Sequence, residues 1–125
     1  MKPGICNGQQ CYINPTLQLR LVQLNGNVSG WQITEAWPAT ANVTHQNPCH
    51  AAGTCVDTNF INSSHNFNSQ VINNYITQAK AAGLKAVYEV KSVTRQNQLL
   101  NAGLPLTSVQ VVPTATAEHF SVYML

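Results

Sequence analysis

The stretch PCHAAGTCVD constrains the fold of this chain most strongly, because it places a cysteine on each side of a His–Gly turn. His50 and Asp57 lie seven residues apart, which is ~10 Å along a straight helix and ~23 Å along an extended strand. Neither regular element brings both side chains to one metal ion, whose bonds are about 2 Å long. Gly53 supplies a permissive backbone at which the chain can fold back. A bond between Cys49 and Cys55 would keep their Cα atoms within ~7 Å and would enforce the same bend.

The four cysteines fall into two local pairs, CNGQQC and CHAAGTC. An even number of cysteines in a short chain with few charges and many asparagines indicates disulfides and an oxidising compartment. We therefore expect bonds within each pair, Cys6–Cys11 and Cys49–Cys55. The rival interpretation is a zinc site made of all four thiolates, but neither pair fits the spacing typical of such sites comfortably.

The composition is that of one globular domain with an unusually neutral surface. The chain has 125 residues, of which 44% are hydrophobic and only 8% are charged, whereas charged residues make up roughly 25% of typical soluble domains. A net charge of +2 and the absence of any Lys/Arg run give no reason to expect nucleic-acid binding. No apolar run approaches the ~20 residues that cross a bilayer, and no leader with an apolar core is visible. We expect a domain of a longer exported protein, located outside the cell, in the periplasm or in the cell envelope.

The pattern of apolar and turn residues predicts an α+β fold with two to three helices and a mostly antiparallel sheet. Residues 1–14 are expected to form a disulfide-clipped segment and residues 15–125 the domain itself. The expected helices are 15–24, which NGN at 25–27 should end, 66–85 and 94–103. The second of these has one apolar stripe at helical spacing, and Gly83 is expected to stop it. The expected strands are 30–37, 54–60, 84–92, 107–112 and 118–125.

A metal bound by His50 and Asp57 needs a third ligand, and His119 is the best candidate. It lies in the apolar strand HFSVYM, where an imidazole without a partner would be costly to bury. A histidine in a strand is also commonly a satisfied core residue, so both interpretations stay open at this point. His45 and His65 lie in polar loops and are expected to be solvated.

The segment HAAGTCVD resembles H-x-x-G-x-A-x-D, the first metal motif of the M15 D-alanyl-D-alanine peptidases and of the related hedgehog signalling domain. Cys55 stands where that pattern usually has Ala. EHFSV resembles the second motif, whose histidine completes the zinc site, and QITEAW and VYEVKS resemble neighbouring segments of the hedgehog domain. The similarity extends from about residue 15 to the end of the chain. It implies a Zn²⁺ site made by His50, Asp57 and His119, with a fourth position left for water, as in catalytic zinc sites.

A metallopeptidase also needs a carboxylate that carries the proton of the attacking water. The M15 peptidases place it three residues before the second-motif histidine, where this chain has Thr116. Glu89 and Glu118 are the remaining candidates. Glu89 is favoured because it is expected in a strand beside that of His119, whereas Glu118 would point to the opposite face of a regular strand. The alternatives are a surface role for Glu89, for instance as a partner of Lys91, and a solvated strand-end carboxylate for Glu118.

The chain departs from the resembled families at two sites, the calcium site of the hedgehog domain and the substrate-binding arginine of the M15 peptidases. The hedgehog calcium site needs acids beyond Glu35 that are missing here, so we expect no calcium. The M15 peptidases tend to hold the carboxylate of the substrate with an arginine near the loop. This chain has Pro38 and Ala39 there, and its only arginines are Arg20 and Arg95. An endopeptidase that cuts inside a cross-link is therefore expected rather than a carboxypeptidase.

Three functional hypotheses follow. The leading one is a small, monomeric zinc peptidase, a hydrolase that acts on the peptide part of peptidoglycan in the cell wall. The second is a catalytically inactive, zinc-stabilised binding module of the same fold that recognises wall peptide or a protein partner. The third is a disulfide-bonded domain in which His50 and Asp57 are structural and no metal binds.

Overall fold

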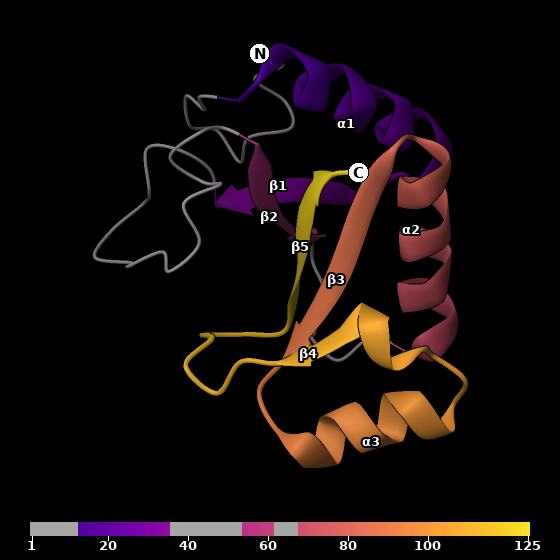
Figure 1. Ribbon diagram of the computed structural model, residues 1–125, viewed down its shortest axis with the longest axis vertical. Coiled ribbons are helices and arrows are strands. Elements are labelled where there is room, and N and C mark those ends of the chain that lie inside the picture. Colours follow the sequence, from indigo (N-terminus) through magenta and orange to yellow (C-terminus); the bar gives the residue numbers. More distant parts are fainter. Residues whose placement is uncertain (1–12, 36–53, 62–67) are drawn as a thin grey trace.

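The computed structural model describes residues 13–35, 54–61 and 68–125 (Figure 1). The described residues form helices and strands in mixed order along the chain, and a 3₁₀ turn at Leu106–Ser108 precedes the fourth strand. The elements are α1 (Pro15–Asn27), β1 (Trp31–Glu35), β2 (Cys55–Phe60), α2 (Ser69–Ala81), β3 (Leu84–Val90), α3 (Val93–Asn101), β4 (Val109–Val111) and β5 (His119–Met124).

The strands form one five-stranded sheet in the order β1-β2-β5-β3-β4. Every neighbouring pair is antiparallel except β3 and β4, which are parallel. β5, the last strand in sequence, therefore lies in the middle of the sheet, between β2 and β3. This arrangement confirms the predicted α+β class with a mostly antiparallel sheet.

The helices contribute buried apolar side chains to one core that they share with the sheet. Figure 1 shows α2 running alongside β3, with α1 across the upper end of the molecule and α3 at the lower end. The buried side chains of α1 and α2 recur at spacings of three and four residues, which places them on one stripe of each helix. These residues are Leu17, Leu21 and Leu24 in α1, and Ile72, Tyr75 and Ala79 in α2. The sheet contributes Val56, Tyr88, Phe120 and Val122 to the same core.

Each helix begins at a side chain that accepts hydrogen bonds from the first turn, which explains where the helices start. Asn14 caps α1, Asn68 caps α2 and Ser92 caps α3. Such caps satisfy backbone N–H groups that have no partner within the helix. After α2 the chain turns at Gly83, whose φ of 79° is in the left-handed region that favours glycine. The predicted stop of this helix at Gly83 is thus confirmed.

The predicted end of the first helix at 25–27 is wrong, because α1 continues through NGN to Asn27. A glycine inside a helix costs only about 1 kcal/mol relative to alanine. Two buried side chains, Leu24 and Val28, lie on either side of Gly26, and the Val28 N–H donates to the Leu24 carbonyl at 2.9 Å. Burial of these side chains outweighs the local preference for a turn.

The expected strand at 107–112 is shorter in the structure, where β4 spans only Val109–Val111 after the 3₁₀ turn. The strand is at the edge of the sheet, where β3 is its one neighbour among the described strands. Short edge strands of this kind limit unwanted pairing with other chains. Within the described ranges, no helix has the length and apolar character needed to cross a membrane.

Candidate metal centre

The register of the sheet brings Asp57, Glu89 and His119 together from three neighbouring strands. Glu89 on β3 pairs directly with His119 on β5, and Asp57 on β2 pairs with Ser121 on β5. His119 and Ser121 are two residues apart in one strand, so their side chains point to the same face of the sheet. Asp57 is therefore the diagonal neighbour of His119, within the reach of cross-strand contacts.

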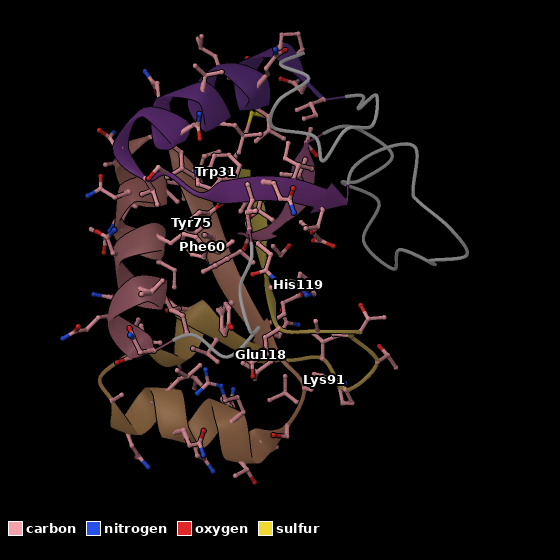
Figure 2. The ribbon with its side chains drawn as sticks, turned by 180° about the vertical axis from the view of Figure 1, so that it is seen from behind. Trp31, Phe60, Tyr75, Lys91, Glu118 and His119 are labelled. Carbon is pink, nitrogen blue, oxygen red and sulfur yellow. The ribbon has the colours of Figure 1, made fainter. Side chains whose placement is uncertain are left out.

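This face of the sheet is opposite to the core. The residues that alternate with the three site residues, including Thr58 and Phe120, are fully buried. Both contact Tyr75 of α2: the Thr58 and Tyr75 hydroxyls are 2.7 Å apart, and the Phe120 and Tyr75 ring centroids are 4.1 Å apart. Figure 2 shows Tyr75 close to α2, and His119 at the lower part of β5. Because side chains alternate along strands, the site residues point away from α2.

The three side chains approach one another at distances typical of a shared ligand or proton. Nε2 of His119 lies 2.7 Å from Oε1 of Glu89 and 3.7 Å from Oδ2 of Asp57. One potential ligand atom from each residue lies within 4.8 Å of the others. The side chains of His119 and Glu89 are 18% exposed and that of Asp57 is 17% exposed. The group is therefore shielded by protein but still accessible to a small ligand.

The second ring nitrogen of His119 is held by the backbone. Nδ1 lies 2.8 Å from the carbonyl oxygen of Ala117, which can only accept a hydrogen bond, so Nδ1 is the donor. Burial of the ring lowers the pKa of His119. The hydrogen bond with Glu89, the charge of Asp57 and the bond to Ala117 outweigh this effect and raise the pKa to about 9. Without an ion, the ring thus carries its second proton on Nε2, between the two carboxylates.

The residues fit a zinc ion in chemistry and in spacing. Imidazole nitrogen and carboxylate oxygen are ordinary zinc ligands, and two ligand atoms at about 2 Å from a tetrahedral ion lie ~3.3 Å apart. The observed separations of 2.7 and 3.7 Å fall on either side of that value. A histidine that donates its other N–H to a backbone carbonyl is also the usual arrangement of a metal-bound imidazole. Among the described residues, Asp57, Glu89 and His119 therefore form a candidate metal centre.

Several of the predicted features lie outside the described residues. His50, the expected third zinc ligand, is one of them, and so are Gly53 and Cys49 of the expected bend. Cys55, two residues before Asp57, is buried and disulfide-bonded. Its expected pairing with Cys49 stays a prediction, as does the expected pair Cys6–Cys11.

Glu118 does not join the group, although it is adjacent to His119 in sequence. Its Oε1 accepts a hydrogen bond from the Tyr88 hydroxyl at 2.6 Å. Nε of Arg95, on α3, donates to both carboxylate oxygens, at 3.2 and 3.0 Å. The two carboxylates considered as proton carriers are thus separated: Glu89 faces Nε2 of His119, and Glu118 is in an ion pair with α3.

Sequence reasoning missed the groups that surround these residues. The bond from His119 to the Ala117 carbonyl has no signature in sequence, because every residue carries a carbonyl. The pairing of Arg95 with Glu118 joins residues 23 positions apart. The one available signal was the scarcity of charge, with four acids in the whole chain. In such a chain few partners exist for any charge, so each arginine has only a small number of acids with which it can pair.

Comparisons of the chain with protein-family models, with curated proteins and with solved structures gave no match.

Proposed function

We propose that this domain is a zinc-dependent peptidase that acts on the peptide part of the bacterial cell wall. The observation that carries the proposal is the convergence of Asp57, Glu89 and Nε2 of His119 on the open face of the sheet. The resemblance of HAAGTCVD and EHFSV to the metal motifs of the M15 peptidases supplies the reaction class. Two of the three ligands implied by that resemblance, Asp57 and His119, belong to this group.

In this proposal the residues of the group have different roles. Asp57 and His119 hold the ion together with His50, and the Ala117 carbonyl keeps Nε2 of His119 directed toward it. Zinc, when bound, supplies a Lewis acid that polarises the peptide carbonyl and lowers the pKa of water. Glu89 takes up the proton of the attacking water on its carboxylate and delivers it to the leaving amine. The position of Glu89 beside Nε2 of His119 supports this role.

The arginines of the chain favour an endopeptidase over a carboxypeptidase. A carboxypeptidase of this type holds the free C-terminus of its substrate with a cationic side chain. Arg20 donates to the Gly83 carbonyl at 2.9 Å, and Arg95 is paired with Glu118. Among the described residues, both arginines are thus bound to groups other than Asp57, Glu89 and His119. We therefore infer that the substrate is an internal peptide bond, such as one in a cross-link.

The state of Cys55 supports a location outside the reducing cytoplasm. This cysteine is disulfide-bonded and only 1% exposed. Disulfides persist in extracellular, periplasmic and cell-surface proteins. A location in the cell envelope is also where a peptidoglycan substrate would be found.

The contact between Glu89 and His119 also favours a second candidate, a zinc-stabilised binding module. At 2.7 Å from Nε2, the Glu89 carboxylate is close enough to become a ligand itself. Together with His50, Asp57 and His119 it would then close the coordination shell with four protein ligands. Closed shells of this kind are typical of structural zinc, which does not activate water.

The two candidates make opposite predictions for Glu89→Gln. If Glu89 carries protons, the variant keeps stoichiometric zinc and releases free amines from purified peptidoglycan about 10²- to 10⁴-fold more slowly than the wild type. If Glu89 is a ligand, the variant loses zinc affinity. Metal analysis and an amine-release assay on the same preparations measure both quantities. Lys91→Gln is the matched control, because it removes a charge from an exposed residue directly after β3 and should change neither quantity.

His119→Ala tests the metal itself. The proposal requires this variant to lose the zinc that the wild type retains through purification without chelator. Stoichiometric zinc in His119→Ala, or no zinc in the wild type, would refute the metal centre and both candidate functions. Zinc in the wild type without any amine release would leave the binding module as the function.

A further inference from the structure

We propose that Glu118 is a positioning residue for His119, and that Arg95 on α3 is its anchor. This inference rests on the proposed function, because it assigns a role toward the metal centre. It also removes Glu118 from the candidates for proton transfer. The argument comes from three sets of contacts that converge on one residue directly before β5.

The first set holds the Glu118 side chain. The single Nε–H of Arg95 is shared between the two carboxylate oxygens, and the Tyr88 hydroxyl donates a further hydrogen bond to Oε1. The Glu118 side chain is 13% exposed and the Arg95 side chain 17% exposed, so this ion pair is mostly shielded from water. Charge-assisted bonds of this type are shorter than neutral ones and roughly twice as strong. The carboxylate is therefore fixed between β3 and α3.

The second set holds the backbone of the same residue. Nδ2 of Asn59, on β2, donates to the Glu118 carbonyl at 2.8 Å. Asn59 is 4% exposed, and its side-chain oxygen accepts the N–H of Phe60 at 3.0 Å. The asparagine side chain is thus itself oriented by β2. Side-chain and backbone contacts together tie Glu118 to β2, β3 and α3.

The third contact leads from Glu118 to the metal centre. The Ala117 carbonyl that accepts the bond from Nδ1 of His119 belongs to the peptide group joining Ala117 to Glu118. The Ala117 carbonyl and the Glu118 carbonyl lie in two planar peptide groups that meet at the Glu118 Cα. Asn59 holds the second peptide group and the Glu118 side chain is held at the Cα between them, so both contacts restrict the backbone rotation that would turn the Ala117 carbonyl away from His119. The carbonyl in turn sets the rotation of the imidazole and the direction of Nε2. The Arg95–Glu118 pair therefore orients His119 without contacting the ion.

The test compares three variants. Glu118→Gln and Arg95→Gln break the ion pair, whereas Arg20→Gln removes a partly buried arginine that bonds the Gly83 carbonyl away from the centre. Zinc affinity is measured by calorimetric titration of the metal-free protein with the metal alone. We expect the first two variants to lose about 10- to 100-fold in zinc affinity, as when supporting contacts of metal ligands are removed. Arg20→Gln should keep the wild-type affinity.

A second readout does not need the metal. Nuclear magnetic resonance of the metal-free protein gives the rate at which the Nδ1 proton of His119 exchanges with water. This rate should rise at least several-fold in Glu118→Gln and Arg95→Gln and stay unchanged in Arg20→Gln. If the wild type binds no zinc, the proposed function fails, but this exchange rate still decides the positioning role.

Two outcomes would overturn the inference. One is a folded Glu118→Gln protein with wild-type zinc affinity and a wild-type exchange rate, which would make the ion pair merely structural. The other is Glu118→Gln with intact zinc and lost amine release while Arg95→Gln stays active, which would make Glu118 the proton carrier.

Discussion

His119 has a hydrogen-bond partner on each ring nitrogen, and the two partners act differently. The Ala117 carbonyl on Nδ1 selects the tautomer and fixes the ring. Glu89 and Asp57 surround Nε2 with negative charge, so this nitrogen attracts either a proton or a metal ion. Proton and metal therefore compete for one atom.

The raised pKa of His119 predicts a pH dependence of stability for the metal-free protein. Its pKa is about 9 in the folded state, against 6.5 for an unperturbed histidine. The folded state thus binds the proton more tightly than the unfolded chain. The resulting stabilisation is fully present below pH 6.5 and is lost as the pH rises through 9. We expect the free energy of unfolding in urea with chelator to fall by on the order of 1–3 kcal/mol over this window.

The control for this measurement is His119→Gln, which keeps a polar side chain of similar length but does not titrate. Its free energy of unfolding should lack the decrease between pH 6.5 and 9 that the wild type shows. Equal slopes in both proteins would show that the imidazole contributes no such linkage.

At this scale, the strand that carries Glu89 could be predicted from the sequence. Glu89 was expected in a strand beside that of His119, and the register pairs the two residues directly. The position of Glu118 was not predictable in the same way. Its carboxylate bonds depend on where α3 packs against the sheet, and packing between distant segments is not encoded in local periodicity.

At the scale of elements, α2 is joined to the sheet by a buried polar contact within an aromatic cluster. The Tyr75 hydroxyl lies 2.7 Å from that of Thr58, and its ring makes edge contacts with Trp31 and Phe60. Burial raises the pKa of Tyr75 above its ordinary range, so the hydroxyl stays protonated. Two buried hydroxyls satisfy each other here, and removing one leaves the other without this bond.

This contact predicts a strong coupling between helix and strand. Tyr75→Phe should destabilise the protein by about 1–3 kcal/mol, because it leaves the Thr58 hydroxyl buried without the bond to Tyr75. Thr58→Val in the Tyr75→Phe background should cost less than it does alone, since both hydroxyls are then absent. Chemical denaturation of the single and double variants measures the coupling. The partly exposed Tyr123 provides the matched control, because Tyr123→Phe should change stability by less than about 0.5 kcal/mol.

The elements themselves were predictable wherever a long periodic pattern coincided with a strong cap. The apolar stripe of α2 and the turn at Gly83 are examples. The end of α1 was not predictable from NGN, because burial of Val28 after the helix overrides the local signal. β4 was overestimated because an apolar run does not show where a 3₁₀ turn will replace the start of a strand.

At the scale of the whole molecule, the sheet consists of two halves joined by one strand. β1 and β2 form one half, β3 and β4 form the other, and β5 lies between them. Ser121 in the middle of β5 is paired with Asp57 on one side and with Val87 on the other. The order of strands along the chain did not reveal this insertion, since sequence-adjacent strands are the more common neighbours.

The central position of β5 predicts that a proline there will disrupt the entire domain. Proline removes a ladder hydrogen bond and is tolerated essentially only at sheet edges. Ser121→Pro should therefore abolish cooperative unfolding, monitored by circular dichroism. Gln110→Pro in the edge strand β4 should cost less and leave a cooperative transition. A native-like transition in Ser121→Pro would contradict the central role of β5.

Because β5 lies between the two halves of the sheet, an ion at the candidate metal centre would be bound by residues of both halves. Asp57 belongs to one half of the sheet, Glu89 to the other, and His119 to β5 between them. β2 and β3 are separated by two strand spacings, ~10 Å, so the two carboxylates meet across β5 rather than along one strand. An ion bound there would cross-link the two halves of the sheet and stabilise their association. Removing the ion should weaken the pairing of β5 with its two neighbours first, while β1 stays paired with β2 and β3 with β4.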